Sequence, residues 1–338
     1  MHRPYFFELF ALANFFLIGV LLLPLTPAVF FSLPKFGMQL VGVFLAELAT
    51  GIVVRLVVGW FDGSARQYLA IIFSPAWLFD TARLIIFAIV ITHTYSWIKL
   101  MVPILHPHRF DHQLWNFETN LFGGYSPTVL FFSLFSTANV LRFVDTTYGP
   151  VFILSMNIAY AYFLSAPSRR LRIAFSDSNA LLWLIGAWIY VAIPTLGPAY
   201  RFHDLWRPYA ALLTQTQSTQ KHLLENYQLV ISRSPHVNRA VDVLLGIAAF
   251  PSLHVAFETF VLLWMRRLWR YGEIIFGICA VLIFIGSVVT GWHYLIDSVA
   301  GIALAVVAYL PVVKAWRMGH WRALSQALSV RFAGVTGP

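Results

Sequence analysis

Charged residues are scarce in this chain of 338 residues, of which they make up only 11%. In soluble domains, charged residues make up about 25% of the chain. Hydrophobic residues make up 59% of the chain and aromatic residues 17%. This balance excludes an ordinary soluble domain and indicates a protein with several membrane-spanning helices.

Cysteine is almost absent. Cys279 is the single cysteine, so the chain cannot form an internal disulfide, and its cellular compartment cannot be deduced from cysteine usage. Tandem repeats and low-complexity tracts are absent as well, which excludes a repeat architecture.

Acidic residues are also few. The chain has 14 Asp and Glu against 23 Lys and Arg, which gives a formal net charge of +9. No soluble stretch is large enough to present a nucleic-acid-binding surface, so we do not expect a nucleic-acid partner. The excess of basic residues in the cytoplasmic loops of membrane proteins explains the charge better.

Long apolar runs dominate what the sequence does contain. A helix needs roughly 20 mostly apolar residues to cross a bilayer, and eight segments meet this requirement. They are residues 5–31, 36–60, 82–105, 147–165, 180–196, 252–268, 273–291 and 294–313. The apolar stretch 125–143 is bounded by glycines and a proline and is interrupted by Asn139 and Arg142, so we interpret it as re-entrant or interfacial.

These segments predict an all-α integral membrane protein with about eight transmembrane helices. Residues 1–81 would form two N-terminal helices and a connector, residues 82–313 a six-helix catalytic core, and residues 314–338 a basic cytoplasmic tail. Two long loops, 106–146 and 197–251, interrupt the core. The first loop mixes histidines, acids and aromatics, and either shapes a site of lipid access or only connects two helices.

Basic residues between and after the predicted helices set the expected orientation. They form three clusters: Arg169, Arg170 and Arg172; Arg266, Arg267 and Arg270; Lys314, Arg317 and Arg322. The positive-inside rule places all three clusters in the cytoplasm. Both termini are then cytoplasmic, and both long loops are extracytoplasmic. We expect an integral protein of a bacterial cytoplasmic membrane.

Two histidines in these apolar segments each have a carboxylate four residues further on. His293 and Asp297 lie in the run TGWHYLIDSVAG, and His254 and Glu258 lie in the run FPSLHVAFE. Residues four apart share one face of a helix, and ionisable groups at membrane depth indicate function. The predicted topology brings both histidines and the loop that follows Gly197 to the same extracytoplasmic boundary.

This set of side chains suits phosphoryl transfer. A neutral imidazole oriented by a carboxylate can act as a nucleophile or a base, and a second histidine can protonate a leaving group. Nearby arginines can bind phosphate oxygens with two donors each. Ser252, at a helix start introduced by Pro251, offers a further site for an anion. No histidine pair has ligand spacing near a third ligand, so we expect no metal and no cofactor.

The run FPSLH, followed about 39 residues later by GWHYLIDSVAG, resembles the second and third motifs of the type 2 phosphatidic acid phosphatase superfamily. The runs IPTLGPAYRF and LFGGYSP and the leucine of PSLH are most similar to the inositol phosphorylceramide synthase-like branch. The resemblance implies that His293 attacks phosphorus to form a phosphohistidine, that Asp297 orients His293, and that His254 protonates the departing alcohol. Water or an acceptor alcohol then resolves the intermediate.

Two positions depart from the family pattern. The third motif usually carries an arginine six residues before its nucleophilic histidine, where this chain has Ser287. The first motif has a lysine seven residues before an Arg-Pro pair, and that position before Arg207 is Tyr200. We therefore predict that Arg201 supplies the main positive charge for the phosphate. Further candidates are Ser252 and Arg207 for phosphate binding and Tyr200, Lys221 and Arg233 as helpers.

Three interior acidic or basic residues have open roles. Glu258 can favour the protonated form of His254, bind headgroup hydroxyls, or pair with an arginine elsewhere in the bundle. Glu47 and Arg55, in the second predicted helix, are expected to pair internally or to snorkel.

We expect a membrane lipid phosphotransferase that moves a phosphate or phospho-headgroup from a lipid phosphate or phospholipid to a second lipid or a polar alcohol. A lipid phosphate phosphatase is the close alternative, because water can resolve the same intermediate. A transporter or scramblase is the distant alternative, since the charges gather at one interface and the sequence shows no inverted repeat.

Overall fold

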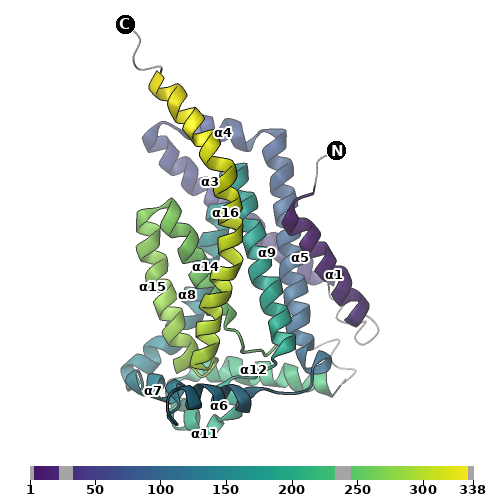
Figure 1. The fold of residues 1–338 in the computed structure, drawn as a ribbon, viewed down its shortest axis with the longest axis vertical. Coiled ribbons are helices and arrows are strands. Elements are labelled where there is room, and N and C mark those ends of the chain that lie inside the picture. The colour runs from purple at the N-terminus through teal and green to yellow at the C-terminus, as the bar shows by residue number, and fades with distance from the viewer. Residues whose placement is uncertain (1–3, 23–32, 233–244, 334–338) are drawn as a thin grey trace.

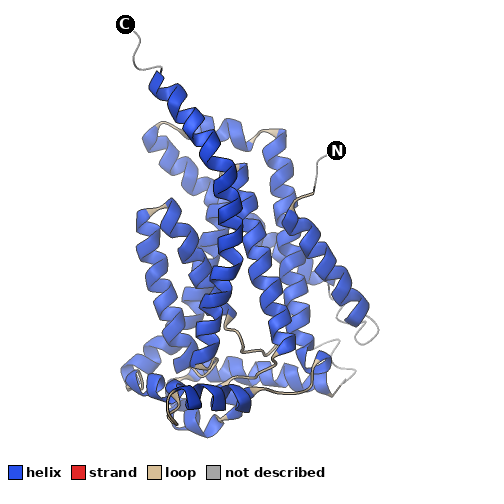
Figure 2. Ribbon diagram, in the orientation of Figure 1, coloured by secondary structure: helices blue, strands red, loops and turns tan. Residues whose placement is uncertain are grey.

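The computed structural model describes residues 4–22, 33–232 and 245–333, apart from the side chains of Leu33 and of residues beyond 316. Every regular element within these residues is a helix (Figure 2). The long apolar runs therefore do form helices, and the all-α class is confirmed.

Helices lie at all eight predicted membrane segments. They are α1 (Phe6–Leu22), α3 (Leu33–Asp62), α5 (Pro75–Leu105), α8 (Ala138–Leu164), α9 (Arg169–Ala192), α14 (Leu253–Leu268), α15 (Arg270–Val289) and α16 (Leu295–Ala333). Within the described residues, four helices are long and apolar enough to cross a membrane: α3, α5, α15 and the first part of α16. Helices α1 and α14 have only 17 and 16 residues. The number of eight spans and the six-helix core therefore remain predictions.

The segment 125–143 divides between two helices. Its first part forms α7 (Pro127–Leu134), and its last part is the start of α8; the two helices are bent by 103° at the break between them. Counted together, α7 and α8 would make a fifth candidate span. The second of these helices begins at Ala138 rather than at residue 147 because Asn139 and Arg142 lie exposed in its first turns.

Short helices form a layer across one end of the bundle. They are α6 (Asp111–Leu121), α7, α10 (Pro198–Arg201), α11 (His203–Trp206), the 3₁₀ helix η1 (Arg207–Leu212) and α12 (Thr214–Ile231). Figure 1 shows α6, α7, α11 and α12 at the end where α14 and α16 begin, whereas the α14–α15 link lies at the opposite end of those helices. The long loops are thus separated from the arginines of that link, and the side that faces the cytoplasm remains a prediction.

The last helix extends well beyond the predicted final span. Helix α16 continues to Ala333, so most of the predicted tail 314–338 belongs to it, and residues 334–338 lie outside the described residues. The proposed division into three parts remains a prediction.

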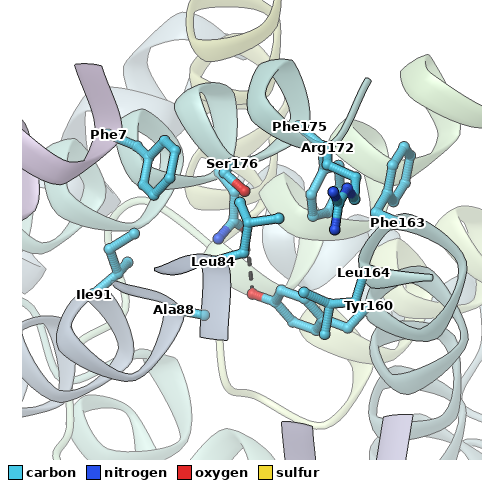
Figure 3. Close-up of a pocket in the computed structure, with 11 residues that line it drawn as sticks. Phe7, Leu84, Ala88, Ile91, Tyr160, Phe163, Leu164, Arg172, Phe175 and Ser176 are labelled. Carbon is cyan, nitrogen blue, oxygen red and sulfur yellow. Dashed lines mark hydrogen bonds between the residues drawn. The ribbon is translucent and has the colours of Figure 1, made fainter. Parts of the chain in front are cut away.

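A small cavity of about 20 Å³ lies in the core between α1, α5, α8 and α9 (Figure 3). The Tyr160 hydroxyl at its edge donates a hydrogen bond of 3.2 Å to Oδ1 of Asn179. A space of this size holds about one water molecule, so it is a packing gap and cannot bind a lipid headgroup.

Candidate active site

His293 lies in the turn that joins α15 to α16. Gly291, two residues earlier, has a φ of +76°, a backbone conformation that favours glycine. A Cβ atom at this position would lie 2.7 Å from the Cβ atom of Ala199. The backbone N–H of His293 donates to the carbonyl of Ser287 at 3.0 Å. The turn is therefore fixed, and it leaves the His293 side chain only 4% exposed.

Hydrogen bonding fixes the tautomer of His293. Its Nδ1 atom lies 2.8 Å from the carbonyl oxygen of Ala249. A carbonyl can only accept, so Nδ1 carries the proton and Nε2 keeps its lone pair. Burial lowers the pKa of His293 to about 3, and the charge of Lys99 also lowers it. The ring is therefore neutral near pH 7, with Nε2 free to act as a nucleophile.

Asp297 stands beside His293 but is not its closest acceptor. The Oδ2 atom of Asp297 lies 3.6 Å from Nδ1 of His293 and accepts the backbone N–H of Tyr294 at 2.9 Å. The Asp297 side chain is fully buried, and Oδ1 has no hydrogen-bond partner among the described residues. Asp297 can therefore stabilise a positive charge on the ring, while the Ala249 carbonyl holds the tautomer.

His254 occupies the first turn of α14, next to His293. The hydroxyl of Ser252 caps this helix by accepting the N–H of Val255 at 3.4 Å. Gly301 permits a close approach of α16, since a Cβ atom there would lie 2.4 Å from the carbonyl oxygen of Ser252. The ring centroids of the two histidines are consequently only 6.0 Å apart.

Both histidines line one cavity of about 240 Å³. Its wall is mostly aromatic and aliphatic, and Lys99 of α5 brings a positive charge to it. The Nζ atom of Lys99 lies 6.0 Å from the ring centre of Tyr95 and 5.8 Å from that of Tyr190. No carboxylate in the described chain forms an ion pair with Lys99. A partly buried ammonium group with no ion-pair partner in the described chain suits this cavity to phosphate.

The sequence interpretation missed Lys99, although two signals pointed to it. A lysine within a predicted membrane span, here 82–105, is costly in lipid and indicates function. Lys99 also lies seven residues before His106 and Pro107, which is the spacing between the lysine and the Arg-Pro pair in the first family motif. The family pattern was matched to Arg207 and Pro208, one of two Arg-Pro pairs in the chain, the other being Arg3 and Pro4.

The basic residues predicted to bind phosphate lie away from this cavity. Arg201 is exposed, and its guanidinium group contacts the ring of His112. Arg207 and Lys221 are exposed too. None of these three basic side chains lines the cavity of the two histidines, and Arg233 lies outside the described residues.

The other predicted helpers are held by protein partners. The hydroxyl of Tyr200 donates to the carbonyl of Gln220 at 3.1 Å, and the hydroxyl of Ser252 serves as the cap of α14. Ser287, where the family usually has an arginine, is fully buried, and its hydroxyl lies 3.0 Å from that of Ser298. The third motif therefore contributes no positive charge at this position.

Glu258 packs against α8. Its Oε1 atom accepts a hydrogen bond from the hydroxyl of Ser155, and its Oε2 atom is buried with no partner in the described part of the chain. Ser155 thus takes the place of the arginine partner considered from the sequence. An effect of Glu258 on His254 remains a prediction. Across the described ranges, no cluster of His, Cys, Asp and Glu could hold a metal ion.

The first long loop holds the start of α16 in place. Asp111 of α6 accepts the hydroxyl of Tyr294 at 2.9 Å and the backbone N–H groups of Leu196 and Gly197 at 3.0 Å. A residue next to His293 is thereby tied both to α6 and to the loop after α9.

Glu118, also in α6, reaches the same helix start. Its Oε1 atom accepts the hydroxyl of Thr128 at 2.5 Å, and its Oε2 atom accepts the N–H of Ile296 at 3.3 Å. The Thr128 hydroxyl in turn accepts the N–H of Leu295 at 2.8 Å. These bonds satisfy amide groups that a helix start leaves free. The loop is therefore more than a connector, because it positions the segment that carries His293.

Glu118 should make the stability of the protein depend on pH. Burial raises its pKa from 4.5 to about 7, so the folded chain keeps a proton that the unfolded chain releases. Stability from this group is complete below about pH 4.5 and is lost as the pH rises to about 7, by at most about 3 kcal/mol. Melting temperatures in detergent between pH 5 and pH 8 should therefore fall less in Glu118→Gln than in the wild type. Equal slopes would contradict this role.

A family model described as the PAP2 superfamily matches residues 112–311. The match spans 200 of the 338 residues (112 to 311 inclusive), more than half of the chain, and includes His254, His293 and Asp297. No curated protein and no solved structure matches the chain. Since the match includes the paired histidines and extends from the α6 layer into α16, the chain belongs to the PAP2 superfamily.

Proposed function

We propose that this protein is a membrane lipid phosphotransferase that works through a phosphohistidine on His293. It would move a phosphate or phospho-headgroup from a lipid donor to an alcohol acceptor. The observation that carries the proposal is the geometry of one cavity. There, His293 has a free Nε2 atom, its ring centroid lies 6.0 Å from that of His254, and Lys99 lines the same wall.

In the first half-reaction, Nε2 of His293 attacks the phosphorus atom of the donor. The bond from phosphorus to the leaving oxygen breaks as the N–P bond forms, and protonated His254 gives its proton to that oxygen. Lys99 offsets the negative charge of the phosphoryl oxygens. The Ala249 carbonyl and Asp297 stabilise the positive charge that develops on the ring of His293.

In the second half-reaction, the hydroxyl of the acceptor attacks the same phosphorus atom. His254, now neutral, takes the hydroxyl proton, and the N–P bond breaks to restore neutral His293. Proton transfer by a positioned side chain contributes roughly 10² to 10⁴-fold to such rates. The cycle returns both histidines to their starting protonation states and requires no further reactant.

Two observations support transfer over hydrolysis. The cavity is small and mostly apolar, and His293 is almost completely buried, which limits the water that can reach the intermediate. The similarity of the motifs to the inositol phosphorylceramide synthase-like branch points the same way. The predicted orientation would place this chemistry at the extracytoplasmic face of the membrane.

Competition between water and an alcohol tests the transferase. Purified protein is incubated with a radiolabelled lipid phosphate and increasing concentrations of a lipid alcohol, and the products are separated. We expect label to move onto the alcohol, with free phosphate as a minor product that decreases as the alcohol increases. Release of free phosphate alone at every alcohol concentration would identify a phosphatase instead. Lipid movement between leaflets that persists in His293→Ala, without turnover in the wild type, would indicate a scramblase.

A further inference from the structure

A second, larger cavity lies between α3, which precedes the matched family segment, and helices within that segment. It has a volume of about 1100 Å³ and lies between α3, α4 (Ala65–Ile72) and α8, reaching the link between α14 and α15. Much of its wall is aliphatic, including Val54 and Val58 of α3 and Leu154 and Ile158 of α8. Cavities that bind drug-sized ligands measure about 300 to 1,000 Å³, so this cavity has room for the chain of a lipid.

Val43 and Glu47 line both cavities, and we call this shared part of the wall the junction. The Glu47 side chain is only 6% exposed, and its Oε2 atom has no hydrogen-bond partner among the residues described. Glu47 and Arg55 were predicted to pair internally or to snorkel, and among the described residues neither forms an ion pair. The guanidinium group of Arg55 instead donates to the hydroxyl of Ser165 and the carbonyl of Tyr162, each at 2.9 Å.

An unsatisfied buried carboxyl group is destabilising. At the junction of two cavities, a ligand that passes from one to the other can supply the missing hydrogen bond. The cavity at His293 is about 240 Å³, against about 1100 Å³ for its neighbour. The smaller space suits a phosphate headgroup, and the aliphatic part of the larger space, at Val54, Val58 and Leu154, suits an alkyl chain.

We propose that the lipid substrate spans both cavities, with its phosphate at His293, its polar linkage at Glu47 and its alkyl chain between α3 and α8. The inference rests on the proposed function, because it takes the phosphate to be at His293. A helix rises 1.5 Å per residue, so Val54 lies about 10 Å and Val58 about 16 Å beyond Glu47 along α3. The larger cavity therefore extends along α3, beside the proposed alkyl chain, from the catalytic end of the helix bundle toward the opposite end of the bundle.

Blocking the larger cavity tests this placement. Val54 lines it and Val53 does not, although the two are 56% and 58% exposed on the same helix. The kcat/KM values of Val54→Trp and of the matched control Val53→Trp are measured with a hexanoyl and a palmitoyl lipid phosphate. We expect Val54→Trp to lower the palmitoyl-to-hexanoyl ratio of kcat/KM about tenfold and Val53→Trp to leave it unchanged. Equal ratios in the two variants would overturn the inference.

The role of Glu47 is tested by two variants at that position. Glu47→Gln keeps a hydrogen-bonding group at the junction, whereas Glu47→Leu removes it at similar size. We expect Glu47→Leu to raise KM about tenfold more than Glu47→Gln does, with kcat similar in both, because the contact is made equally in the ground and transition states. A larger effect of Glu47→Gln than of Glu47→Leu would show that Glu47 does not hydrogen-bond the substrate.

Photolabelling tests the placement without requiring turnover. His293→Ala protein is loaded with a palmitoyl lipid phosphate that carries a diazirine at the chain terminus, irradiated and analysed by peptide mass spectrometry. We expect label on α3 near Val54 and Val58 or on α8 near Leu154. Label from the chain-terminal diazirine that is confined to residues around Lys99 would overturn the inference. In a second experiment with the diazirine on the headgroup, label near Arg55 would overturn it too. Labelling at α3 with no turnover in the wild type would instead refute the proposed function alone.

Discussion

Replacement of His293 by alanine should lower kcat by about 10⁴-fold or more. The variant lacks the Nε2 lone pair, so no covalent intermediate can form, and residual turnover would need direct attack by the acceptor. The effect should fall on kcat, because the rest of the cavity that binds the headgroup remains. Steady-state turnover of a lipid phosphate in detergent measures it.

A matched control removes a histidine that lies outside the cavity. His222 is exposed and lies 3.9 Å from Glu225 on α12, so His222→Ala should retain wild-type turnover. Both variants should elute as the wild type does in size-exclusion chromatography, which separates a chemical effect from misfolding. Turnover by His293→Ala within about tenfold of the wild type would exclude His293 as the nucleophile.

Replacement of Lys99 by methionine should lower kcat/KM about 10² to 10³-fold. Methionine keeps the approximate length and the apolar stem of lysine but removes the charge that faces the phosphate in a cavity poor in water. The same change at Arg201 should alter kcat/KM by less than about threefold, because that guanidinium group is exposed and contacts His112.

The pair of variants decides which residue binds the phosphate. Lys99→Arg, which keeps the charge on a different shape, should retain more activity than Lys99→Met. Near-normal kcat/KM in Lys99→Met together with a large loss in Arg201→Met would contradict this assignment. It would show that Arg201, in the loop after Gly197, binds the phosphate, as predicted from the sequence.

The sequence predicted the positions of the long helices well because apolar runs of membrane length have few alternatives. It was less accurate where polar residues lie inside a helix. The segment 125–143 does contain a break, with a bend of 103° between α7 and α8, but the break precedes Asn139 and Arg142, which lie exposed in the first turns of α8.

For the site, local spacing was enough to predict that His293 and Asp297 lie side by side, and Nδ1 of His293 lies 3.6 Å from Oδ2 of Asp297. It could not show that the carbonyl of Ala249 accepts the imidazole proton, because a backbone group leaves no mark in the sequence. The sequence marked Lys99 only as a lysine within a predicted span, because its closeness to the histidines depends on how α5 packs against distant segments.

The role of the carboxylates in the first long loop could not be predicted from the surrounding sequence. Asp111 and Glu118 occur in a polar segment that looks solvent-exposed, but both are buried against the start of α16. Only the tertiary structure shows that this loop positions the segment carrying His293, whose motif was recognised without it.

The most direct test of the proposed chemistry is the detection of a phosphate on His293 during turnover. Protein mixed with a radiolabelled lipid phosphate is quenched in alkali, which preserves phosphohistidine, and its peptides are analysed by mass spectrometry. The proposal predicts a phosphate on Nε2 of His293 that disappears when an acceptor alcohol is added and never forms in His293→Ala. Turnover without a phosphate on His293, or with the phosphate on another residue, would contradict it.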